Sequence, residues 1–138
     1  MWAGKSLVKC VHEGEKSLAT DIQSTIDGIH SGALDEGDLL QLLTDARALV
    51  RANVLLELPK RKLVSAELVT SAVMQAAHAP GHADVRLMGT VTQRVLAVAT
   101  LAWLRTENAK AAFERELNSL GDAERERARE LVAEGSAS

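Results

Sequence analysis

The run VLAVATLAWL, from Val95 to Leu104, presents apolar side chains on nearly every side of a helix. A helix of this kind is surrounded by protein, and a chain of 138 residues can enclose only one such helix fully. The run is about half as long as a membrane-spanning helix, so it predicts a buried helix and not a membrane span. We expect this helix to be central, with a partner subunit supplying the cover that one small domain lacks.

Most of the remaining chain repeats apolar residues every three or four positions, which is typical of amphipathic helices. The expected helices cover 6–30, 35–58, 65–78, a segment that begins between 84 and 90 and ends at 121, and 123–134. No segment alternates convincingly between apolar and polar residues. The sequence therefore predicts an all-α fold, a bundle of four or five mostly antiparallel helices with short connections. One domain would span 1–138, with residues 135–138 frayed.

Composition excludes several classes of protein. Aromatic residues make up only 2% of the chain, so a core must be built from leucine, valine, isoleucine and alanine. The net charge of −3 gives no general attraction to nucleic acid or to an anionic membrane. Cys10 is the single cysteine, which excludes an internal disulfide and favours a reducing compartment. We expect a soluble, cytoplasmic protein.

Two histidine-containing stretches are candidate metal sites. In HAPGH, His78 and His82 have the spacing that lets two histidines of one helix bind the same metal. Pro80 and Gly81 interrupt a helix, so we interpret this stretch as a turn. HEGE, residues 12–15, contains one His-x-x-Glu, whereas a di-iron bundle needs Glu-x-x-His on two helices. We expect neither a metal site nor a cofactor.

Three polar residues, Glu15, Asn53 and Arg94, lie beside or within apolar stripes. Asn53 falls in a heptad seam of the second helix, where a buried asparagine can fix register and oligomeric state. We favour this structural role for Asn53, and salt bridges at a bundle edge for Arg51 and Arg94. The alternative is that Glu15, Asn53 and Arg94 orient a small ligand inside an apolar pocket.

A short basic stretch, Lys60, Arg61 and Lys62, precedes the third expected helix. Such residues could contact phosphate groups beside a recognition helix. The helix that follows, SAELVTSAVMQAAH, offers few side chains that read bases. A solvated loop is therefore the interpretation we favour, and nucleic-acid binding is the minor one.

The chain contains no Gly-x-Ser-x-Gly motif and no Walker loop. Cys10 and His12, two residues apart, point to different sides of a helix. Enzymatic activity is left open, but we favour a non-catalytic interaction or regulatory protein that contacts another polypeptide and forms a homodimer or higher oligomer. A ligand-binding bundle, either carrier or enzyme, is the second hypothesis, and a nucleic-acid-binding regulator is the third. The expected subunit interface consists of Val95, Val98, Ala102 and Asn53.

Overall fold

The computed structural model describes residues 17–137, which form seven α-helices, one 3-10 helix and a two-stranded antiparallel sheet. The elements are α2 (Ser17–Ser31), α3 (Glu36–Leu42), α4 (Ala48–Glu57), η2 (Leu58–Lys60), α5 (Ala66–His78), β1 (Arg86–Met88), β2 (Val91–Thr92), α6 (Gln93–Leu104), α7 (Glu107–Ser119) and α8 (Asp122–Ala137). The predicted all-α class is confirmed. In this part of the chain, no helix has the length and apolar character needed to cross a membrane.

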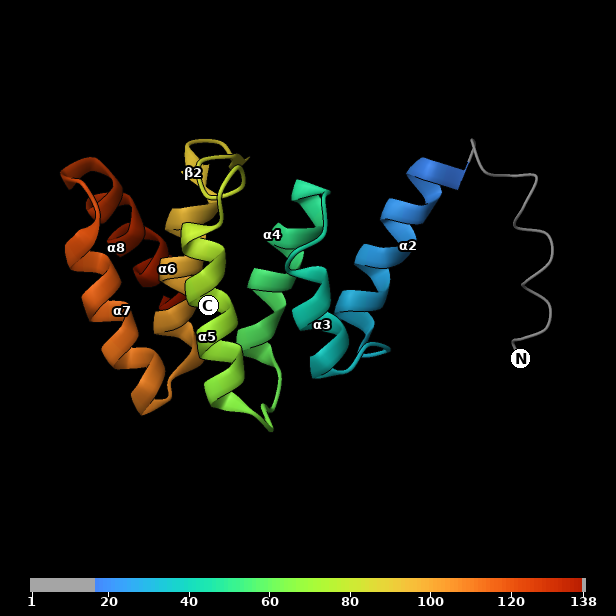
Figure 1. Cartoon of the computed structure of the whole chain (residues 1–138), viewed down its shortest axis with the longest axis horizontal. Helices are drawn as coiled ribbons and strands as arrows, with labels where there is room; N and C mark the ends of the chain where they lie inside the picture. The colour runs from blue at the N-terminus through green and yellow to red at the C-terminus, as the bar shows by residue number, and fades with distance from the viewer. Residues whose placement is uncertain (1–16, 138) are drawn as a thin grey trace.

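The helices stand side by side in a row, with α2 at one end and the pair α7 and α8 at the other (Figure 1). The main contacts join neighbours in this row: α2 and α3 pack on α4, α4 packs on α6, and α5 packs on both α6 and α7. Helices α7 and α8 also pack on α6. As expected, α6 is the central helix. The row has two layers, one containing α3, α5 and α7 and the other containing α4, α6 and α8.

The second expected helix starts as predicted but does not continue. The Asp35 carboxylate accepts a hydrogen bond from the backbone N–H of Asp38 at 2.9 Å, and the Asp38 carboxylate accepts one from the N–H of Asp35 at 3.3 Å. This reciprocal cap starts α3. The prediction of one helix over 35–58 was wrong, because a turn over 43–47 separates α3 from α4.

Buried Arg51 stabilises that turn. Its side chain is 1% exposed, and its guanidinium donates to the backbone carbonyls of Asp45 and Ala46 at 2.8 and 3.1 Å. Its Nε donates to Oε1 of buried Gln93 at 2.6 Å, and Gln93 donates in turn to the carbonyl of Ala76 at 3.0 Å. Burial lowers the pKa of Arg51 below its usual value. The expected role of Arg51 in an edge salt bridge was wrong, because it lies in the core and bonds neutral acceptors.

The fourth expected helix is also divided. The Thr92 hydroxyl accepts a hydrogen bond from the N–H of Val95 at 3.3 Å, which caps α6 after the short β1–β2 hairpin. At the other end, Arg105 adopts a left-handed conformation with φ of 62°. The Thr106 hydroxyl then accepts from the N–H of Ala109 at 3.1 Å and caps α7. A left-handed residue cannot continue a helix, so the expected continuous helix to residue 121 was wrong.

The HAPGH stretch is a turn, as predicted. Helix α5 ends at His78, Ala79 is extended, and Gly81 has φ of 79°. His78 and His82 therefore do not lie on one continuous helix. Nε2 of His78 lies 2.6 Å from Oε1 of Glu116, which ties the end of α5 to α7.

Helix α6 is enclosed by its own chain. Nine of its 12 residues are buried, and Val95 and Val98 are only 2% and 0% exposed. A partner subunit is therefore not needed to cover Val95 and Val98. Val95 and Val98 could contact a second copy only if the fold opened, whereas Ala102 and Asn53 are half-buried. Association of two copies stays a prediction, and it requires a different surface.

Two buried threonines differ in the hydrogen bonding of their hydroxyl groups, so the same substitution can be compared at both positions. The Thr70 hydroxyl is buried without a partner among the described residues, while that of Thr100 lies 2.9 and 3.2 Å from the carbonyls of Leu96 and Leu55. Because an unpaired buried hydroxyl is costly, we expect Thr70→Val to raise the free energy of unfolding by about 1 kcal/mol and Thr100→Val to lower it by about 1 kcal/mol. Urea denaturation measures both. Shifts of the same sign would contradict the assignment.

Candidate functional site

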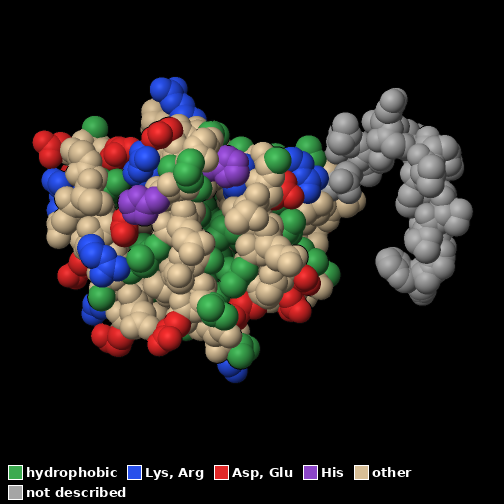
Figure 2. All heavy atoms as spheres, viewed as in Figure 1, with side chains coloured by type: hydrophobic (Ala, Val, Ile, Leu, Met, Phe, Trp, Pro, Cys, Tyr) green, Lys and Arg blue, Asp and Glu red, His purple; other side chains and the backbone are tan. Residues whose placement is uncertain are grey.

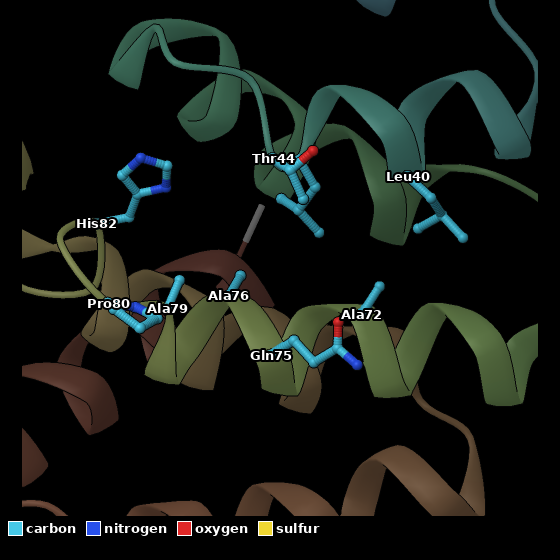
Figure 3. Close-up of a pocket in the computed structure, with 9 residues that line it drawn as sticks. Leu40, Thr44, Ala72, Gln75, Ala76, Ala79, Pro80 and His82 are labelled. Carbon is cyan, nitrogen blue, oxygen red and sulfur yellow. The ribbon is translucent and has the colours of Figure 1, made fainter.

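A groove of about 300 Å³ lies between α3 and α5. We call it the α3–α5 groove; its lining residues are Leu40, Leu43, Thr44, Ala72, Gln75, Ala76, Ala79, Pro80 and His82. In Figure 3 the side chains of Ala72, Ala76 and Ala79 point from α5 and its C-terminal end toward Leu40 and Thr44 across open space. The two helices therefore face each other without closing the gap between them.

The spacing of small residues on α5 explains the gap. Ala72 and Ala76 are four residues apart on one face of α5, and Ala79, the C-cap residue three positions further on, points to the same side. A methyl group extends far less from the helix than a leucine side chain, and α3, with seven residues, covers only part of this face. The space that remains is open to solvent at the surface. Leu43 and Ala76, 3% and 5% exposed, form its floor.

Exposed apolar residues extend this face beyond the groove. Leu68, one turn before Ala72 on the same side of α5, is 63% exposed, and Val64 just before the helix is 90% exposed. Figure 2 shows hydrophobic side chains gathered between α3 and α5 on this side of the molecule. Large exposed apolar residues next to an apolar groove are typical of an interaction surface.

The chemistry of the α3–α5 groove is that of a binding surface. Among the described residues that line it, none is an aspartate, glutamate, lysine or arginine. Its polar groups, Thr44, Gln75 and His82, stand at its borders, where they can bond to a bound backbone. The groove can therefore hold apolar side chains, but its lining does not bring together an acid and a base or a nucleophile and a base.

A second, larger cleft of about 610 Å³ lies on the layer that contains α4 and α6. We call it the α4–α6 cleft; its lining residues are His30, Asn53, Leu56, Pro59, Lys60, Trp103, Leu104, Arg105 and Gly135. It is contributed by α2, α4, η2, α6 and α8 with the residues that follow them, and by neither α3 nor α5. The α3–α5 groove and the α4–α6 cleft therefore lie on different elements.

Asn53 and His30 join α4 to α2 at this cleft. The amide nitrogen of Asn53 donates to the carbonyl of Leu49 at 2.8 Å, so its Oδ1 faces Nε2 of His30 at 2.7 Å. Nδ1 of His30 lies 3.0 Å from Oε1 of Glu57. Both ring nitrogens of His30 therefore lie within hydrogen-bond distance of side-chain oxygens of α4. The heptad seam expected for Asn53 does not form, since Leu49 of that seam is 54% exposed.

Buried Glu57 anchors the same network. Its Oε2 accepts from Nε of Arg61 at 2.8 Å, and Arg61 also donates to the carbonyls of Leu34 and Ile29, each at 2.8 Å. Burial acts to raise the pKa of Glu57, but the hydrogen bonds from Arg61 and His30 outweigh it and hold that pKa below its usual value. Glu57 is therefore ionised at neutral pH, and its carboxylate contacts Arg61 and His30 within the protein.

Arg94 does not join Asn53 at the α4–α6 cleft. Glu15 lies outside the described residues. Arg94 forms salt bridges with Asp84 at 2.5 Å and Glu124 at 3.6 Å, which confirms its expected role at an edge of the fold. The partner Asp84 raises the pKa of Arg94 further above its usual value. Of the two described residues, Asn53 and Arg94, Asn53 lines the α4–α6 cleft and Arg94 does not.

The basic stretch does not present one common surface. Arg61 points inward and bonds Glu57 and two backbone carbonyls. Lys60 lines the α4–α6 cleft, whereas Lys62 lines a different hollow beside Glu36 and Leu39. Three phosphate contacts from Lys60, Arg61 and Lys62 would therefore require Arg61 to leave its partners.

Sequence reasoning missed the residues that line the α3–α5 groove. The signal was present in the small-residue stretch SAELVTSAVMQAAHA, in which Ala72, Ala76 and Ala79 are four and three residues apart. Within residues 17–137, no group of three or more histidine, cysteine or acidic side chains is placed to hold a metal ion. Comparison of the chain with protein-family models, curated proteins and solved structures found no match.

Proposed function

We propose that this protein is a non-catalytic helical interaction protein of the cytoplasm that binds an apolar segment of another polypeptide in the α3–α5 groove. The observation that carries the proposal is the strip formed by Leu68, Ala72 and Ala76 of α5 and its C-cap residue Ala79, which faces Leu40 across open space. The single cysteine supports a reducing compartment.

The dimensions of the strip suit an amphipathic helix. From Leu68 to Ala79 the strip extends about 16 Å, which is about three helical turns. Peptide helices that bind in grooves insert side chains spaced three, four and seven residues apart. The alanines leave room for two or three such side chains, and Gln75 and Thr44 supply polar contacts at the edge. A second copy of this chain is the other occupant to be distinguished.

Site-specific photocrosslinking tests the proposal in cells that produce the full chain. A benzophenone amino acid at exposed Gln75, in the groove lining, is expected to give one discrete adduct. The same probe at exposed Lys110 on α7 is expected to give none. In an Ala72→Glu background the Gln75 adduct should decrease about tenfold or more, because a carboxylate would enter an apolar groove. The matched variant Ala123→Glu, at an exposed position of α8, should leave the adduct unchanged.

The mass of the adduct distinguishes the occupants. An adduct with a different polypeptide supports a regulatory partner, and an adduct of twice the chain mass supports a homodimer through this surface. Equal labelling from positions 75 and 110, or an adduct that persists in Ala72→Glu, would overturn the proposal.

A further inference from the structure

The α4–α6 cleft has the chemistry of a site for a small organic anion. We propose that it binds a molecule with an apolar body and one carboxylate group. This inference goes beyond the proposed polypeptide-binding function, because the two sites share no lining residue. Either site can be occupied without the other.

The body of the ligand would contact an apolar floor. Leu56, Pro59 and Leu104 line the cleft together with the half-buried indole of Trp103. Gly135 closes one side, and it lies so close to Trp103 that a Cβ at this position would overlap the indole ring. The volume of about 610 Å³ is within the range of sites that hold small molecules, roughly 300–1,000 Å³.

The charge of the cleft selects an anion. Lys60 and Arg105 line it, and neither forms a salt bridge with a carboxylate in the part of the chain that the structure describes. No aspartate or glutamate is among the described lining residues. The nearest buried acid, Glu57, already contacts Arg61 at 2.8 Å and His30 at 3.0 Å, so its charge is compensated. Two unpaired cations beside an apolar floor favour a ligand that combines a negative group with an apolar body.

The helix ends at the cleft provide a competing explanation for these cations. Helices α2, α4 and α6 end beside it, and helix C-termini carry partial negative charge that a nearby lysine or arginine offsets. Under that explanation Lys60 and Arg105 would contribute to stability alone. Under our proposal they also contribute to ligand affinity, and binding measurements separate the two roles.

The site can be tested with decanoate, decanol and decylamine, which share one apolar chain and differ in head-group charge. Each is used below its critical micelle concentration. Trp2→Phe leaves Trp103 as the single tryptophan, so its fluorescence reports occupancy of the cleft. We expect saturable binding of decanoate and weaker binding of decanol and decylamine. Lys60→Gln/Arg105→Gln should weaken decanoate binding about five- to tenfold and leave decanol unchanged. The matched double variant Lys110→Gln/Arg129→Gln removes two exposed charges elsewhere and should change the decanoate Kd by less than about twofold.

Three outcomes would overturn the proposal. The first is equal affinity for decanoate and decanol, and the second is an equal loss of affinity in both double variants. The third is a lower Tm for Lys60→Gln/Arg105→Gln with unchanged decanoate affinity, which would assign the cations to the helix ends. Crosslinking from Gln75 reports on the α3–α5 groove and not on the α4–α6 cleft. If that crosslinking failed, the decanoate measurements could still be interpreted.

Discussion

Replacing Arg51 by methionine is expected to lower the free energy of unfolding by about 3 kcal/mol. Methionine fills much of the arginine volume, so the loss reports hydrogen bonding more than packing. The substitution leaves Oε1 of Gln93 and the carbonyls of Asp45 and Ala46 without their donor. Urea denaturation monitored by circular dichroism measures the change. As a control, Arg86→Met, at an exposed position, should change stability by less than about 0.5 kcal/mol.

A double-mutant cycle separates the network from the individual side chains. Gln93→Leu removes the acceptor of Arg51 and the donor to Ala76 together. We expect Arg51→Met/Gln93→Leu to be less destabilising than the sum of the single variants, by about 1–2 kcal/mol. Additive losses would show that the two side chains act independently, which would contradict the bonding described for the core.

Val98→Asp is expected to unfold the protein. Val98 is 0% exposed at the centre of α6, and an unpaired carboxylate there costs about 4 kcal/mol or more, a large part of the stability of an ordinary domain. The expected result is loss of the helical circular dichroism signal at 25 °C. Ala123→Asp, at an exposed position at the start of α8, is the matched control and should keep it.

The same variant decides between two explanations for the apolar character of α6. If Val98 were covered by a second copy, Val98→Asp would yield a folded monomer by analytical ultracentrifugation. The structure instead attributes its cover to α4, α5, α7 and α8 of one chain. A folded, monomeric Val98→Asp protein would therefore contradict the packing of α6.

Local signals predicted several elements of the fold correctly. The Asp35 cap, the end of α5 at His78 and the turn at Gly81 depend on residues close in sequence, and all three are confirmed. The central position of α6 followed from its composition alone. These features need no knowledge of which segments meet in space.

Long-range contacts explain what the sequence did not predict. Periodicity favoured one helix over 35–58, but Arg51 bonds two carbonyls of the turn at 43–47 while its Nε donates to Gln93, 42 residues away. Arg105 ends α6 in a left-handed conformation that glycine or asparagine usually adopts, so no residue type marked the break. The lining of the α3–α5 groove and of the α4–α6 cleft likewise comes from separate helices. Periodicity assigns a residue to one face of its own helix, but it does not identify the helix that lies opposite.

The row of helices also affects how the protein loses structure and how its sequence can change. In arrays where elements contact mainly their neighbours, the free energy divides into a contribution from each element and one from each interface. Helix α2 lies at one edge and packs chiefly on α4, so its detachment breaks fewer contacts than the removal of any central helix. Opening can therefore begin at that edge while α5 to α8 stay assembled. A destabilising substitution near one end can likewise be compensated by residues of the adjacent helices, without any change at the far end.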